Sequence, residues 1–183
     1  MQSRTPPGAE PGSTRAELDS LLSAELTSVV AGARRRAVRD GDRQIDTAHL
    51  LHSLLESDPA VRAVFGDGGQ VVRLLGYLVQ RSIGYGLQWQ GTVEDSGAVP
   101  LVTSVKEAGW SPAAATAMET ALDRAELRGD PRALGMDLLA GLVTDPECRA
   151  VEVLGRAGVD VPRLLVRVDA ECQEYAEEYG TGS

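Results

Sequence analysis

The side chains best suited to chemistry lie on one short stretch of the chain and are His49, His52 and Glu56. On a helix, steps of three and four residues place all three on one face, where two imidazoles and a carboxylate can hold a metal ion. No Cys or Asp cluster elsewhere in the sequence obviously completes such a site. We therefore expect no metal site and interpret His49 as a hydrogen-bonding support residue. A metal-dependent sensor or enzyme stays open as an alternative.

The candidates for nucleophilic catalysis are few. Cys148 follows Pro146 at the expected start of a helix, a position that lowers the pKa of a thiol. No histidine follows it, because His49 and His52 both lie far upstream. A Gly-x-Ser-x-Gly motif is absent, and the single lysine, Lys106, does not lie in a phosphate-binding loop. We expect Cys148 to be a small buried residue, and we expect neither catalytic residues nor nucleotide hydrolysis.

Five arginines, three of them consecutive from Arg34 to Arg36 and the others Arg39 and Arg43, form a basic cluster. Guanidinium groups at such a density can bind a phosphate or an acidic partner. Asp40 and Asp42 lie between them, however, and a solvated helix face with mixed charges explains the same pattern. We favour the solvated face.

The composition is that of a globular protein of 183 residues, with 43% hydrophobic and 25% charged residues. Asp and Glu number 27 against 18 Lys and Arg, and the resulting net charge of -9 repels nucleic-acid phosphate. No apolar run approaches the roughly 20 residues of a membrane span, and the polar N-terminus does not resemble a signal peptide. With only two cysteines, a cytoplasmic location is expected. We expect no cofactor, no nucleic-acid partner and no membrane partner.

The elements that position these residues are predicted to be helices. Apolar residues recur at three- and four-residue steps from Leu26 to Ala37, with Ser23 as N-cap and Gly41 as C-terminal cap. This pattern predicts a helix from Ser23 to about Asp40. A second helix, capped by Asp46 or Thr47, has a leucine stripe that comprises Leu50, Leu51, Leu54 and Leu55.

An internal repeat decides the fold prediction. When the chain is shifted by 88 residues, positions 23–58 align with 111–146 without a gap, and nine of the 36 positions are identical. The identities include Ser23/Ser111, Gly41/Gly129 and Leu54/Leu142, which are a cap, a helix end and a core residue. Each half is expected to contain four helices, so the sequence predicts an all-α, pseudo-twofold domain of about eight helices.

The boundaries follow from the repeat. We expect a disordered tail at 1–14, repeat 1 at 15–84, an arm at 85–109, repeat 2 at 110–179 and a short tail at 180–183. Within the arm, Tyr85, Leu87 and Trp89 alternate with smaller or polar residues. A short β-hairpin or an extended arm is therefore predicted between the repeats.

The repeat resembles the Clp N-terminal repeat at the front of ClpA- and ClpC-type unfoldases. In that family each repeat opens with an aromatic residue, Thr and Pro or an acid, and later has the signature Ile/Val-Gly-Thr-Glu-His-Leu-Leu. Here the openings are Leu22-Ser23 and Trp110-Ser111-Pro112. The signature corresponds to "IDTAHLL" at 45–51 and, more weakly, to "ALGMDLL" at 133–139. The resemblance covers about Ser23 to Ala170.

The resemblance implies a binding domain that receives peptides, adaptors or substrate proteins. Without a phosphate-binding loop, the chain resembles a stand-alone Clp N-domain that lacks the AAA+ ATPase modules. We expect a non-enzymatic decoy that sequesters hydrophobic or cyclic peptides, including cyclic peptide natural products that target Clp, or a modulator of Clp proteolysis. An adaptor that docks onto Clp ATPase or protease subunits is the alternative.

Two sites are implied by position in the family. ClpC-type phosphoarginine pockets resemble one another in the Glu of each signature, which pairs with a guanidinium group. Ala48 and Met136 stand there in this sequence, so phosphoarginine recognition is expected to be lost. A peptide groove between the first helices of the repeats corresponds to Val30, Trp110, Ala115, Glu119 and Leu122, with Tyr85 and Trp89 as further candidates. Trp110 is either the anchor of that groove or a core residue.

Overall fold

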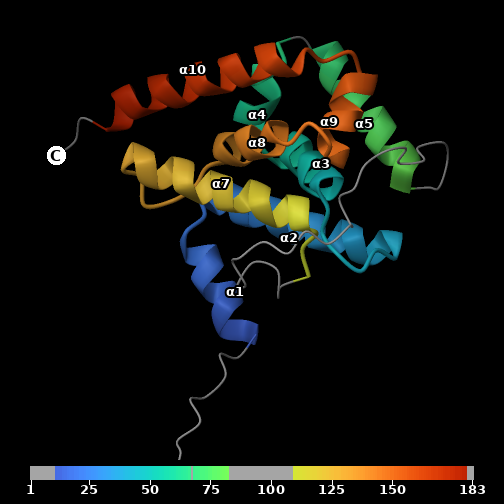
Figure 1. Ribbon diagram of the computed structural model, residues 1–183, viewed down its shortest axis with the longest axis horizontal. Helices are drawn as coiled ribbons and strands as arrows, with labels where there is room; N and C mark the ends of the chain where they lie inside the picture. Colours follow the sequence, from blue (N-terminus) through green and yellow to red (C-terminus); the bar gives the residue numbers. More distant parts are fainter. Residues whose placement is uncertain (1–10, 67, 83–108, 181–183) are drawn as a thin grey trace, which may run out of the picture.

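The computed structural model describes residues 11–66, 68–82 and 109–180, and within these residues the fold is all-helical (Figure 1). Nine helices are found in the described part of the chain: α1 (Pro11–Ser20), α2 (Ala24–Asp40), α3 (Thr47–Ser57), α4 (Pro59–Val64), α5 (Gly68–Ser82), α7 (Pro112–Arg128), α8 (Gly135–Thr144), α9 (Arg149–Arg156) and α10 (Val161–Tyr179). Helices α2 to α5 form the first repeat, and α7 to α10 form the second. The predicted double four-helix architecture is confirmed.

The predicted caps set the ends of the first helix in each repeat. Ser23 accepts a hydrogen bond from the amide of Leu26 at 3.1 Å, and Ser111 does the same for Ala114 at 3.1 Å. Both helices end in a glycine with positive φ, Gly41 at 73° and Gly129 at 78°. A side chain there would be strained, which explains why both repeats keep glycine at this position.

Two isolated β-bridges join the repeats, and they are related by the same offset of 88 residues. Leu22 pairs with Ala133, and Ile45 pairs with Trp110. The opening residue of each repeat thus pairs with the loop before the second helix of the other repeat. The backbone amide of Ser23 donates to Ala133 at 2.9 Å, and that of Ser111 donates to Ile45 at 2.8 Å. This exchange fixes the relative orientation of the two halves.

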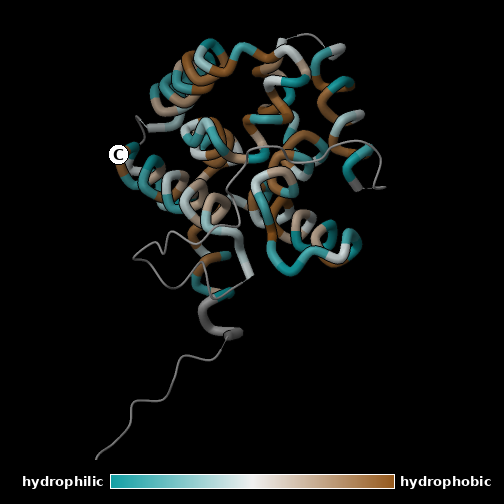
Figure 2. The backbone as a smooth tube through the Cα atoms, turned by 45° about the vertical axis from the view of Figure 1, so that its right-hand side comes forward, coloured by the Kyte–Doolittle hydropathy of each residue, from teal (hydrophilic) through white to brown (hydrophobic). Residues whose placement is uncertain are grey.

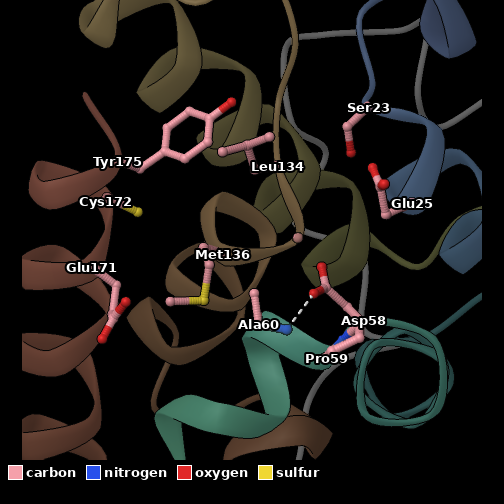
Figure 3. A pocket seen from close by; sticks show the side chains of 11 residues that line it. Ser23, Glu25, Asp58, Pro59, Ala60, Leu134, Met136, Glu171, Cys172 and Tyr175 are labelled. Atoms are coloured by element: carbon pink, nitrogen blue, oxygen red, sulfur yellow. Dashed lines mark hydrogen bonds between the residues drawn. The ribbon is translucent and has the colours of Figure 1, made fainter. Parts of the chain in front are cut away.

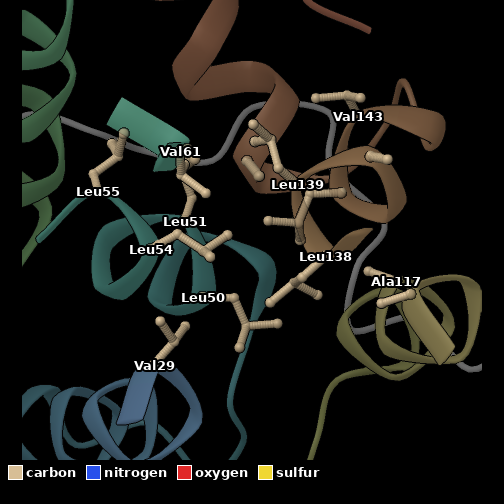
Figure 4. Close-up of a cluster of buried hydrophobic side chains, with 14 of the residues drawn as sticks. Val29, Leu50, Leu51, Leu54, Leu55, Val61, Ala117, Leu138, Leu139 and Val143 are labelled. Carbon is tan, nitrogen blue, oxygen red and sulfur yellow. The ribbon is translucent and has the colours of Figure 1, made fainter. Parts of the chain in front are cut away.

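The core lies between the two leucine-rich helices, α3 and α8, which contact each other in the middle of the bundle (Figure 4). Hydrophobic and hydrophilic residues alternate along the described helices, as is typical of helices with one buried face (Figure 2). The leucine stripes are fully buried: Leu50, Leu51, Leu54 and Leu55 in α3, and Leu138, Leu139 and Leu142 in α8. Burial of this apolar surface is the main source of stability.

The N-terminal part differs from the prediction, because α1 begins at Pro11, inside the segment 1–14 that was expected to be a tail. Proline is favourable in the first turn of a helix, since its missing N–H needs no partner there. The predicted hairpin or arm at 85–105 lies outside the described residues, as do Tyr85 and Trp89. Among the described helices, none combines the length and apolar character needed to cross a bilayer.

Candidate functional site

A cavity of about 510 Å³ lies where four helices of both repeats converge, at the starts of α2, α4 and α8 and beside the second half of α10 (Figure 3). Apolar side chains form part of its wall, with Met136 and Leu134 from the start of α8 and Ala60 from α4. Met136 is 8% exposed. Because these apolar residues line the cavity, its wall can contact the aliphatic part of a ligand.

The start of α4 is held against the cavity by Asp58. One of its carboxylate oxygens, Oδ1, accepts hydrogen bonds from the amides of Ala60 at 3.0 Å and Val61 at 3.3 Å, so the side chain caps the helix. The other oxygen lies against Gly135, where an added Cβ atom would be 2.1 Å from it. Glycine at 135 therefore makes room for the carboxylate.

The charged residues that line the cavity are all acidic. Glu25 and Glu171 are exposed, and Asp58 is buried. Tyr175 lies at the same cavity, with its ring 4.8 Å from that of Tyr179. An acidic cavity with an apolar wall and an aromatic ring suits a cationic group on an aliphatic stem.

The twofold-related position in the first repeat is filled by the protein itself. By the offset of 88, Asp46 corresponds to Leu134 and Ala48 to Met136. The carboxylate of Asp46 binds Arg81 from α5 and, at 3.0 Å, Arg149 from α9. Two guanidinium groups thus occupy the region that corresponds to the open cavity of the second repeat.

The helix ends show why only one of the two positions is open. Both α5 and α10 contain the sequence Arg-Leu-Leu, at 73–75 and 163–165, and eight residues after its arginine stand Arg81 and Glu171, respectively. Arg149 begins α9, whereas Pro59 begins α4. The cavity at the start of α8 therefore lacks both guanidinium groups and carries an additional carboxylate, that of Glu171.

Comparison with solved structures identifies the architecture. The N-terminal domain of the caseinolytic protease-associated chaperone ClpD from Arabidopsis thaliana superposes with a TM-score of 0.60 at 18% identity, covering 84% of this chain and 95% of that one. A structure described as part of preliminary structural investigations of a malarial protein secretion system also has a TM-score of 0.60, at 15% identity, covering 87% of this chain and 97% of that one. The chain has the Clp N-terminal domain fold. No family model matches the sequence, and no curated protein matches it.

Within the Clp N-terminal fold, the predicted peptide groove is largely packed. Val30 and Ala115 are buried, and Trp110 is 1% exposed, which places it in the core. Glu119 and Leu122 on α7 are half-buried. Of the two interpretations of Trp110, its burial agrees with the core residue, and peptide binding near α7 stays a prediction.

The two positions of the predicted phosphoarginine pockets differ from each other. Ala48 is buried in the first repeat, whereas Met136 lines the open cavity. Of the residues that line the cavity, Met136 was predicted from the sequence, whereas Glu25, Asp58, Glu171 and Tyr175 were not. A signal was available for Glu171, because its place after the shared Arg-Leu-Leu can be counted from the sequence.

The histidines do not form one metal site with Glu56. His52 Nε2 lies 3.2 Å from Glu56 Oε1, while His49 Nε2 points to Asp42 at 3.1 Å and Asp40 at 3.6 Å. Among the described residues, Asp40, Asp42 and His49 are close enough to share an ion. His49 Nδ1, however, accepts a hydrogen bond from the amide of Asp46 at 3.0 Å, which places the proton on Nε2. A protonated nitrogen has no lone pair to offer a metal ion, so His49 in this tautomer is not a ligand.

Cys148 is the N-cap residue of α9 and is 1% exposed. Its thiol donates to the carbonyl of Leu142 at 3.3 Å. This placement agrees with the prediction that Cys148 is a small buried residue.

Proposed function

We propose that this chain is a non-enzymatic protein-binding module that takes a basic side chain of a peptide or protein segment into the acidic cavity. The observation that supports this most strongly is the set of three carboxylates, from Glu25, Asp58 and Glu171, around a partly apolar wall. The likeness of the fold to a ClpD N-terminal domain supports a binding role related to Clp.

The ligand class follows from the charges around the cavity. A lysine or arginine side chain can lay its methylene groups along Met136 and Leu134 and direct its charge to the carboxylates. The twofold-related position, where Asp46 binds Arg81 and Arg149, supplies an internal example of guanidinium binding. A phosphorylated arginine is disfavoured, because its phosphoryl group would face the same carboxylates and no lining residue is basic.

In the cell, the module would act as a decoy that sequesters hydrophobic or cyclic peptides directed at Clp, or as a modulator of Clp proteolysis. The alternative is an adaptor that docks onto Clp ATPase or protease subunits. Degradation of a model substrate by a Clp protease separates these roles. A decoy restores degradation only when an inhibitory peptide is present, whereas an adaptor or modulator changes the rate without one.

The binding experiment uses fluorescence anisotropy with a labelled apolar peptide that carries one arginine. The matched peptide carries citrulline, which keeps the shape and loses the charge. We expect the citrulline peptide to bind about tenfold more weakly, the size of one charge-assisted hydrogen bond. Phosphoarginine is expected to show no saturable binding in a calorimetric titration.

The variant Glu171→Gln should weaken binding of the arginine peptide. Glu174→Gln is the matched control, because it removes the same charge from an exposed position of the same helix that does not line the cavity. Equal affinity for the arginine and citrulline peptides, or equal effects of the two variants, would show that the cavity does not recognise the positive charge of the peptide.

A further inference from the structure

A second cavity, of about 340 Å³, lies at the other end of α10 between the junction of α4 and α5 and the junction of α9 and α10. Both repeats contribute to it. Its lining includes Gly66, Gln70, Gly158, Asp160, Arg163 and Arg167. Gly66 and Gly158 have positive φ, at 81° and 78°, and because glycine has no side chain, the backbone forms part of the wall at both positions.

Near this cavity, one arginine of each repeat donates a hydrogen bond to a backbone carbonyl of the other repeat. Arg167 of α10 donates to the carbonyl of Val64 at the end of α4, at 3.3 Å. Arg73 of α5 donates to the carbonyl of Ala157 after α9, at 3.2 Å. Each guanidinium group thus holds a helix end of the opposite repeat and stands close to a glycine, Arg167 beside Gly66 and Arg73 beside Gly158.

The charge at this place is unusual for the protein as a whole. The chain has a net charge of -9, and many of its arginines are paired with carboxylates, as Arg128 is with Asp137. Within the described residues, Arg73, Arg163 and Arg167 form no ion pair with a carboxylate. A guanidinium group has five N–H donors, and Arg73 and Arg167 each use one of them in the hydrogen bond to the opposite repeat.

We propose that this cavity binds a phosphate-sized oxyanion. Arg163 and Arg167 line the cavity, and Arg73 Nη1 lies beside Gly158, which forms part of the wall. Guanidinium groups match the oxygens of phosphate or sulfate with paired hydrogen bonds. The glycine wall lets the anion approach the backbone closely.

One carboxylate also lines the cavity, that of Asp160. Its Oδ1 accepts a hydrogen bond from the amide of Arg163 at 3.0 Å and caps α10. The cavity therefore holds one carboxylate against two lining guanidinium groups, and the balance favours an anion.

The test is a calorimetric titration of the full chain with inorganic phosphate and with sulfate at low ionic strength. Arg163→Gln removes a guanidinium group that makes no bond to the rest of the described protein, so it should leave the fold intact. Arg35→Gln is the matched control, since Arg35 is exposed on α2, away from this cavity. We expect saturable binding to the wild-type chain, about tenfold weaker binding to Arg163→Gln and unchanged binding to Arg35→Gln.

Two results would overturn the proposal. One is the absence of saturable binding, and the other is an equal loss in Arg163→Gln and Arg35→Gln, which would indicate unspecific screening of charge. Glu171→Gln, at the acidic cavity, should bind phosphate as the wild-type chain does. That variant separates this site from the one proposed for basic peptides.

Discussion

Asp137 occupies in the second repeat the position that His49 occupies in the first, 88 residues earlier, and both side chains accept a hydrogen bond from the amide three residues before them. The distances are 3.0 Å from Asp46 N to His49 Nδ1 and 2.9 Å from Leu134 N to Asp137 Oδ2. A ring nitrogen and a carboxylate oxygen thus perform the same structural task at the start of α3 and α8.

Each of these two residues also contacts a residue at the end of the preceding helix, and the charge of that residue differs between the repeats. Arg128 donates two hydrogen bonds to Asp137, at 2.7 and 2.8 Å. These hydrogen bonds raise the pKa of Arg128 above its ordinary value. In the first repeat, Asp40 takes the position of Arg128 and lies 3.6 Å from His49. The pair is preserved as an interaction although both residue types have changed.

Asp137→Ala tests this pair. Asp137 is completely buried, and its substitution leaves the amide of Leu134 without a partner. It also removes both short hydrogen bonds of Arg128, which keeps the longer contact with Asp130 at 3.6 Å. We expect the free energy of unfolding to fall by about 3 kcal/mol, as when one partner of a buried ion pair is removed. Urea unfolding followed by circular dichroism measures it.

The control for that variant is Asp169→Ala, because Asp169 also binds an arginine, Arg124, but is itself exposed. An exposed pair contributes less than about 1 kcal/mol. Similar losses for the two aspartates would contradict the role assigned to Asp137.

Trp110→Ala gives a second prediction, which separates the two interpretations of this residue that the sequence left open. A groove anchor would lose ligand binding and keep its fold. Because the indole is 1% exposed, truncation should instead lower the free energy of unfolding by about 3 to 5 kcal/mol. Thermal unfolding decides between these outcomes, with Leu127→Ala, at an 88% exposed position, as the control that should change little.

The sequence predicted the helices and their symmetry well, because caps and leucine stripes are local signals. Ser23, Gly41 and Asp46 act as caps where the pattern placed them. The cavity was harder to predict, since the starts of α3 and α8 are equivalent positions and only the one at α3 is filled by arginine side chains. That depends on Arg81 and Arg149, which reach Asp46 from 35 and 103 residues away.

The same limit applies to Gly135. In the sequence, Gly135 aligns with Thr47 of the first repeat, and the difference between the two residues gives no indication of a site. In the structure it makes room for Asp58 of the other repeat, a contact that no local pattern records. Long-range contacts of this kind decide the shape of a site but leave no periodicity in the sequence.

Gly141→Ala gives a third prediction, on the packing of α7 against α8. An added Cβ atom at Gly141 would lie 2.3 Å from the backbone carbonyl oxygen of Ala117, which cannot turn aside as a side chain can. We expect a loss of about 1 to 3 kcal/mol in the free energy of unfolding, as for other overpacked cores.

Gly76→Ala is the matched control for Gly141→Ala. It is the same change inside helix α5, where an added Cβ atom meets nothing within 4 Å. That variant should gain about 0.5 to 1 kcal/mol from reduced chain entropy. A gain at both positions would mean that α7 and α8 are not in close contact at Gly141.

The last prediction concerns His52, which burial keeps neutral. Desolvation by burial, aided by the positive charge of Arg36, lowers the pKa of His52 from 6.5 to about 4, although Glu56 acts in the opposite direction. Between those two values, the unfolded chain binds a proton at His52 that the folded chain does not. The stability associated with His52 is therefore complete above pH 6.5 and is lost as the pH falls toward 4.

Comparison with His52→Gln isolates this effect, because glutamine does not titrate and His49 is present in both proteins. Urea unfolding at pH 7.5, 5.5 and 4.5 should show the wild-type chain losing stability relative to the variant as the pH falls. Curves that stay parallel across this range would mean that His52 has a similar pKa in the folded and unfolded states. Such a result would place the imidazole of His52, which is 4% exposed in the structure, in contact with water.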